Sequence, residues 1–140
     1  MSYNPIMVWL LYSPLHGMLS KFLMVVNYTG RKSGKHYRLP VGYKKTDGTL
    51  LTISLKKRTW WRNMRGGAPV LVHLQGRDIN AIAEVVEDDE QVEQGLRDFI
   101  GGNPRDARMF GIKVETDGSL NLESLNRAVK ERVIVRTILQ

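Results

Sequence analysis

Apolar and polar residues alternate along several stretches of the chain, and this period of two is typical of half-buried β-strands. Strands are expected at residues 23–28, 37–44, 50–55, 69–75, 79–85 and 132–139. Tight turns at residues 46–48 and 76–78 join successive strands, so we expect an antiparallel sheet that closes into a barrel. Pro40 and Gly42 interrupt one strand, which favours a sheet edge, a bulge or a close approach of the backbone to a ligand.

Helical spacing of apolar residues separates some of these strands. Residues 59–65 predict a short helix with Thr59 as its N-cap. Residues 88–100 and 121–130 predict longer helices that each bury one face. A further helical turn should begin at Asn103, where a proline follows in the first turn.

The N-terminal segment 5–23 predicts one or two short helices, broken near Pro14. Its apolar residues go all round the helix, so we expect it to be buried; a membrane-surface or substrate-gating role is the alternative. Together the elements predict one domain of the α+β class, mainly β, over residues 1–140. Its parts are a helical segment (1–22), a barrel core (23–87), and helices with a final strand (88–140).

The composition excludes several kinds of site. The 140 residues include no cysteine, which excludes disulfides, thiolate metal sites and cysteine nucleophiles. The three histidines are scattered singly at spacings that suit no metal site, so no metal is expected. No apolar run approaches the ~20 residues of a membrane span.

Charge is distributed unevenly along the chain. Residues 1–77 contain 13 Lys and Arg but one acid, Asp47, whereas residues 78–140 contain 8 Lys and Arg and 13 acids. The net charge is therefore +12 in the first part and −5 in the second, within a total of +7. This asymmetry favours an anionic partner for the basic part.

A glycine-flanked cationic segment at residues 28–36 is the first candidate for that partner's site. Gly30 and Gly34 bracket two cations and a serine, and Lys35 adds a third cation. Backbone amides that converge where glycines allow a turn, together with a hydroxyl and positive side chains, favour phosphate binding. The glycine spacing is not that of a Walker A loop. A basic turn kept for solubility is the alternative.

A second basic cluster combines cations with adjacent tryptophans at residues 56–62. Trp60 and Trp61 could stack a planar ring while Lys56, Lys57 and Arg58 hold its anionic tail. They could also bind single-stranded nucleic acid, or one indole could belong to the core and the other could cover it.

The order of these segments resembles the deazaflavin-dependent nitroreductase family. The resemblance rests on the run Thr-Gly-Arg-Lys-Ser-Gly-Lys at 29–35, Leu39-Pro40 in the next strand, an Asp-Gly hairpin, Trp-Trp-Arg-Asn at 60–63, and Gly-Ala-Pro at 67–69. It covers about residues 5–87. It implies a six-stranded split β-barrel of the flavin-reductase, FMN-binding type, which binds reduced coenzyme F-420 or, as the alternative, FMN.

The resemblance also implies which residues hold the cofactor. The loop would bind the phosphate, the strand around Pro40 would lie against the ring, and the tryptophan helix would close the other side. The implied cofactor residues are Arg31, Lys32, Ser33, Gly34, Lys35, Arg38, Leu39, Pro40, Val41, Ser54, Lys56, Lys57, Arg58, Trp60, Trp61, Asn63 and Met64. Lys56-Lys57-Arg58 stands where the family often has a glycine-rich stretch, and this basic departure, like the net +12, favours the longer anionic tail of F-420.

The function implied is hydride transfer to an electron-poor acceptor such as a quinone, a nitro compound or an activated alkene. The protein would bind and orient the reactants, and no protein nucleophile is needed. The proton donor stays open among Tyr12, Tyr28, Tyr37 and Tyr43. Alternatives are a non-catalytic carrier of a cofactor, haem or lipid on the same barrel and, less favoured, a nucleic-acid-binding barrel.

The expected partners follow from this function. They are an anionic redox cofactor and a small hydrophobic acceptor, without a metal. A homodimer is a further expectation from the family. We expect a cytoplasmic protein, with peripheral membrane contact through the N-terminal helix as an option.

Overall fold

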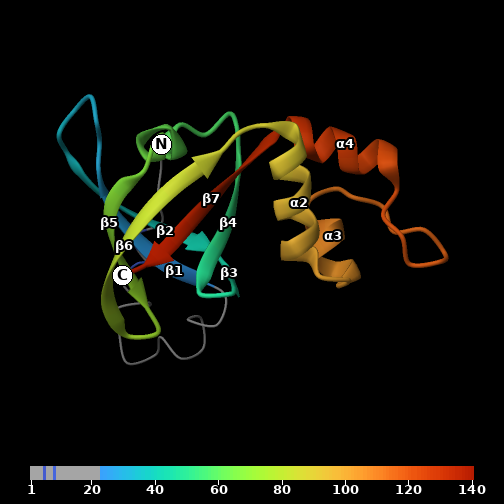
Figure 1. Ribbon diagram of the computed structural model, residues 1–140, viewed down its shortest axis with the longest axis horizontal. Helices are drawn as coiled ribbons and strands as arrows, with labels where there is room; N and C mark the ends of the chain where they lie inside the picture. The colour runs from blue at the N-terminus through green and yellow to red at the C-terminus, as the bar shows by residue number, and fades with distance from the viewer. Residues whose placement is uncertain (1–4, 6–7, 9–22) are drawn as a thin grey trace.

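The computed structural model describes residues 5, 8 and 23–140. One antiparallel sheet of seven strands, in the order β2-β1-β5-β6-β7-β4-β3, curls into a barrel at one end of the molecule (Figure 1). The strands are β1 (Leu23–Thr29), β2 (His36–Gly42), β3 (Lys44–Thr46), β4 (Thr49–Leu55), β5 (Ala68–Leu74), β6 (Arg77–Val86) and β7 (Arg132–Leu139). The helices are the 3-10 helix η2 (Trp60–Met64), α2 (Asp89–Ile100), α3 (Pro104–Met109) and α4 (Leu122–Lys130).

The two edges of the sheet belong to one continuous segment of chain. β2 pairs with β1 at one edge and β3 pairs with β4 at the other, and only Tyr43 separates β2 from β3. The predicted strand 37–44 therefore crosses a strand boundary, because residues 37–42 pair with β1 whereas Lys44 begins β3 and pairs with β4. The expected strand count of six is corrected to seven. Pro40 lies on an edge strand, as predicted.

The barrel closes along β2 and β4, which face each other without forming a ladder. One hydrogen bond crosses this seam, from Thr52 Oγ1 to the Gly42 carbonyl at 3.0 Å. The split barrel that the sequence predicted is thus confirmed, and its seam lies between these two strands.

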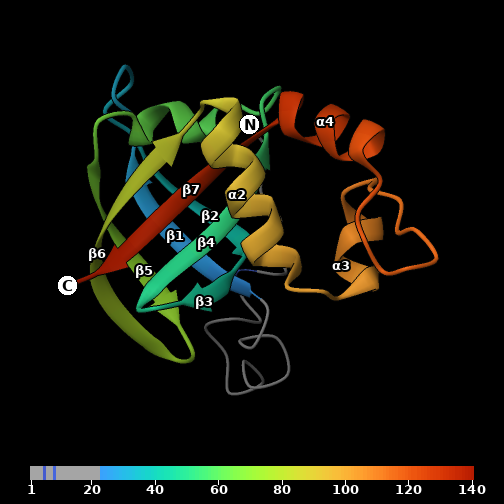
Figure 2. The same ribbon diagram turned by 45° about the vertical axis from the view of Figure 1, so that its right-hand side comes forward.

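Two hydrophobic cores share the strands β4 and β7. The inner core fills the barrel, where Leu50 of β4 and Val133 of β7 pack with the aromatic residues of η2. The outer core lies between the other face of the same strands and α2, α3 and α4, and it includes Leu51 and Ile134. Figure 2 shows α2 lying across β4 and β7.

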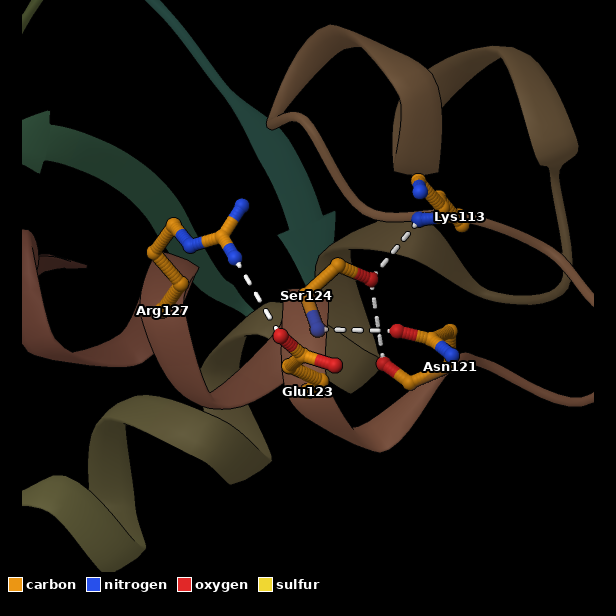
Figure 3. Close-up of polar contacts among 5 residues, drawn as sticks. All are labelled: Lys113, Asn121, Glu123, Ser124 and Arg127. Atoms are coloured by element: carbon orange, nitrogen blue, oxygen red, sulfur yellow. Dashed lines mark hydrogen bonds and ion pairs between the residues drawn. The ribbon is translucent and has the colours of Figure 1, made fainter.

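The C-terminal helices begin at side-chain caps where the sequence placed them. Asp88 accepts a hydrogen bond from the Gln91 amide, and Asn121 Oδ1 accepts one from the Ser124 amide at 2.9 Å (Figure 3). Ser124 Oγ in turn accepts from the Lys113 amide, which ties the preceding loop to α4. Thr59 is the N-cap residue of η2, as predicted, but its side chain makes no capping hydrogen bond.

Most of the predicted N-terminal helix, residues 5–23, lies outside the described residues. Of this segment, Pro5 and Val8 are helical, and Val8 is buried against Val25 of β1. Within the described part of the chain, no helix combines the length and the apolar character needed to span a membrane.

Candidate functional site

The loop between β1 and β2, residues 30–35, closes on itself through backbone bonds. The Gly30 amide donates to the Lys35 carbonyl and the Gly34 amide to the Gly30 carbonyl, both at 2.8 Å. The Lys35 amide donates to Ser33 Oγ at 3.2 Å. The amides of Gly30, Gly34 and Lys35 therefore hold the loop itself together. The exposed side chains of Lys32 and Lys35 supply the positive charge of the loop.

Arg31 and Asn63 join this loop to η2. The Arg31 amide donates to Asn63 Oδ1 at 2.9 Å, and the Arg31 guanidinium donates to the Gly67 carbonyl at 3.2 Å. Asn63 Nδ2 donates to the Trp60 carbonyl at 2.8 Å. The two predicted site segments, far apart in sequence, are therefore in direct contact, and Arg31 and Asn63 hold them together.

A stack of aromatic rings lies beneath this junction. The Tyr28 and Tyr37 rings are stacked with their centroids 5.3 Å apart, and Trp60 lies 6.3 Å from Tyr28. Burial, and secondarily the charge of a Tyr37 phenolate, raises the pKa of Tyr28 to about 12. Tyr28 therefore keeps its proton at neutral pH and is a weak acid.

A groove of about 300 Å³ opens along the β2–β4 seam, and we call it the seam groove. Its residues include six that the sequence proposed for the cofactor. The lining consists of Leu39, Pro40, Val41, Gly42, Thr52, Ile53, Ser54, Leu55, Arg58, Trp60, Phe110 and Arg132. Because β2 and β4 form no hydrogen-bonded ladder here, a flat ligand can lie against the strand backbone.

Trp60 is the member of η2 that lines the seam groove. Its indole is 3% exposed, and Nε1 donates to Ser54 Oγ at 3.0 Å, so the ring has a fixed orientation. Ser54 itself is a predicted site residue on β4. The pair forms a rigid wall at the point where β4 ends.

Trp61 and Met64 lie in the barrel core instead of the groove. Met64 is 0% exposed, and the Trp61 ring is covered by the Arg65 guanidinium 5.1 Å from its centroid. Arg65 makes two 3.0 Å hydrogen bonds to Glu87, which hold the pKa of that carboxyl below its usual range. These residues stabilise the wall from behind.

Arg38 faces away from the seam groove. It lies on a larger, open cavity of about 700 Å³ on the outer face of β1, β2, β5 and β6, together with Asn27 and Asn80. Because side chains alternate along β2, Arg38 and Leu39 belong to opposite faces of the strand. The structure therefore does not bring Arg38 together with the other predicted residues.

Exposed cations lie on the two segments that η2 connects to the seam groove. Lys32 and Lys35 belong to the loop that contacts Asn63, and Lys57 and Arg58 follow β4, where Arg58 lines the groove. Within the described residues, none of these four side chains lies within 4.0 Å of a carboxylate. Their charge is therefore available to an anion.

Sequence reasoning missed the other six lining residues of the groove. Gly42, Thr52, Ile53 and Leu55 lie on strands that carry predicted residues, whereas Phe110 and Arg132 come from the C-terminal third of the chain. Phe110 follows α3, and Arg132 begins β7 directly opposite Leu55 in the ladder with β4. A cation at the start of a β-branched strand was visible in the sequence. Its position depends on a strand register spanning more than 70 residues, which no local pattern encodes.

No metal centre is placed among residues 5, 8 and 23–140. No group of three or more His, Asp or Glu side chains there could hold an ion. His73 instead pairs with Asp78 at 2.7 Å, and His36 with Thr29 at 3.0 Å.

The comparisons with known proteins agree with this geometry. A family model described as F420H(2)-dependent quinone reductase matches residues 14–99. No curated protein matches the chain.

Solved structures with the same fold are distant in sequence. An F420-H2 dependent reductase, FDR-A, is 18% identical with a TM-score of 0.51, over 81% of this chain and 92% of that one. The general stress FMN/FAD binding protein of Xanthomonas citri is 13% identical with a TM-score of 0.54, over 86% and 77%. A structure described as a domain-swapped dimer is 18% identical with a TM-score of 0.53, over 84% and 81%.

At sequence identities below 20%, these structures show only that the fold is shared. The family model matches more than half of the chain and therefore shows the family. The predicted resemblance to deazaflavin-dependent reductases is confirmed. The chain belongs to the F420H(2)-dependent quinone reductase family and is a split-barrel oxidoreductase that uses coenzyme F420.

Proposed function

We propose that the seam groove holds the deazaflavin ring and that the surrounding cations hold its anionic tail. The observation that supports this most directly is the contact between the cationic loop and η2 through Arg31 and Asn63, because Trp60 of η2 lines the groove. The residues present fit this cofactor. A partly apolar groove holds Arg58 in its lining, and Lys32, Lys35 and Lys57 are exposed on the adjoining segments without a described carboxylate within 4.0 Å.

The residues then divide into three tasks. Leu39, Pro40 and Val41 offer backbone and apolar surface to one ring face, while Ser54 and Trp60 form a rigid wall. The cations orient the tail, and Trp61 and Met64 support the wall from the core. When bound, F420H2 supplies a hydride, and the protein contributes position, exclusion of water and charge.

We propose a quinone as the acceptor, as the description of the family suggests. The flat ring of a quinone suits the apolar strand wall of the groove, and nitro compounds and activated alkenes share its electron-poor character. A homodimer is part of the proposal, and the similar fold of a domain-swapped dimer supports it.

The test is a comparison of cofactor affinity in two charge-matched variants. We expect the native protein to bind oxidised F420 more tightly than FMN, with both affinities measured by fluorescence titration. Replacing Lys32 and Lys35 by alanine should weaken F420 binding by about 10-fold or more, since each lost contact with a charged group removes roughly 1.5–3 kcal/mol at most.

The control variant replaces Lys45 and Lys130, which are exposed outside the groove, and removes the same charge. It should retain F420 affinity. Equal losses in both variants would mean that only net charge matters, and no binding of F420 or FMN to the native protein would refute the proposal. Anaerobic reduction of menadione by F420H2 then tests the acceptor.

A further inference from the structure

We propose that Arg132 and Phe110 form the acceptor subsite of the seam groove, and that this subsite selects aromatic acceptors carrying an ionised oxygen. This inference rests on the proposed function. It assigns a substrate class to two residues that lie outside the segment matched by the family model.

Arg132 and Phe110 form a stacked pair at the groove. The Arg132 guanidinium lies 5.6 Å from the centre of the Phe110 ring. The Phe110 ring packs edge-on against Phe99 at 5.5 Å, which fixes its plane. A planar cation held over an aromatic ring presents a flat surface with hydrogen-bond donors at its rim. That surface matches a flat acceptor with an oxygen at its edge.

The guanidinium of Arg132 has few polar partners, although the side chain as a whole is only 14% exposed. Its polar contacts are made by Nη1, to the Ala128 carbonyl at 3.4 Å and to a Glu131 carboxylate oxygen at 3.7 Å. Within the described residues, Nε and Nη2 donate to no protein atom. Burial lowers the pKa of Arg132, and the charge of Glu131 offsets this effect only in part. A ligand oxygen would supply them.

The acceptor is a better occupant for this cation than the cofactor tail. The exposed cations Lys32, Lys35 and Lys57 already offer flexible, solvated charges of the kind that hold a phosphate and carboxylates. Arg132 is instead a largely buried side chain of the groove, beside Phe110 and opposite Leu55. A buried guanidinium discriminates between anionic and neutral acceptors, because a neutral ring leaves its hydrogen-bond donors without an acceptor.

Two naphthoquinones of nearly equal shape test the inference. Lawsone carries an ionised hydroxyl at neutral pH, whereas menadione carries a methyl group at the same ring position. The protein is first saturated with oxidised F420, and each quinone is then titrated by isothermal calorimetry. We expect the native protein to bind lawsone more tightly than menadione.

Replacing Arg132 by methionine should weaken lawsone binding by about 10- to 100-fold and leave menadione binding nearly unchanged. Arg132→Lys keeps a cation and should retain part of the preference, which separates loss of charge from loss of structure. Phe110→Leu should weaken both ligands. The matched control is Arg136→Met, on the same strand but outside the groove, and it should change neither affinity.

Three results would overturn the subsite. They are an absence of preference in the native protein, an equal loss of both quinones in Arg132→Met, and a loss of F420 affinity in that variant with lawsone binding intact. The last result would assign Arg132 to the cofactor. Failure of F420 itself to bind is a different outcome, because it refutes the proposed function at the first step.

Discussion

The cations of the loop at residues 30–35 have different roles although the sequence presents them as one cluster. The amide and the guanidinium of Arg31 are hydrogen-bonded to Asn63 and Gly67, whereas Lys32 and Lys35 are exposed to solvent. A positive side chain that holds the fold cannot move to meet a ligand, and an exposed lysine can. Cofactor affinity should therefore depend on the lysines directly and on Arg31 through the position of the loop.

Tyr28 makes the stability of the protein depend on pH in the alkaline range. Its pKa is raised to about 12, so the folded protein holds this proton more tightly than the unfolded chain, where a tyrosine titrates near about 10. The stabilising contribution is complete below about pH 10 and is lost as the pH rises toward about 12. We expect the free energy of unfolding to fall across this window.

Urea denaturation at a series of pH values measures this effect. Tyr28→Phe should flatten the alkaline part of the stability curve, because phenylalanine has no proton to lose. Absorbance titration of the native protein should show one phenol that ionises late and is missing from the variant. An alkaline slope that is the same in both proteins would argue against this assignment.

The sequence predicted individual strands and helices better than it predicted which of them pair or pack together. Strand 132–139 and the starts of α2 and α4 follow from local alternation and capping residues, and the structure has them there. The break at Tyr43 and the place of Arg132 beside Leu55 depend on which strands pair, which only the closed barrel decides. Local patterns therefore predicted one wall of the groove and missed the other.

The loop between β1 and β2 requires a glycine at position 30, because there is no space for a side chain there. A Cβ there would lie 2.6 Å from Ser33 Oγ and 3.0 Å from the Tyr37 ring. Gly30→Ala should push the loop away from η2 and weaken F420 binding, at a cost of about 1–3 kcal/mol in stability. Fluorescence titration and thermal unfolding measure the two effects.

Removing the Ser33 hydroxyl gives the internal control for this prediction. The double variant with Gly30→Ala and Ser33→Ala lacks the closest contact and should recover part of the lost affinity and stability. A double variant that is as impaired as the sum of the two single ones would show that the crowding at Ser33 is not the cause.

At the scale of the whole molecule, the two cores share their central strands. Leu50 and Leu51 are neighbours on β4, yet the first faces the barrel core and the second faces the helices. The outer core therefore cannot come apart without exposing one face of β4 and β7. We propose that the chain unfolds as a single cooperative domain, with the C-terminal helices as an integral part.

Leu125 tests this coupling because it is fully buried in the outer core, on α4. Leu125→Ala should cost about 2–5 kcal/mol. If the domain is cooperative, the urea midpoint should fall by the same amount in far-ultraviolet circular dichroism, which follows the helices, and in the fluorescence of Trp60 and Trp61 within the barrel. A Trp9→Phe background removes the third indole from the signal.

Leu122→Ala is the matched control, since this side chain on the same helix is 65% exposed and should leave both midpoints in place. A dichroism transition that shifts while the tryptophan transition stays would mean that the barrel folds independently of its helices.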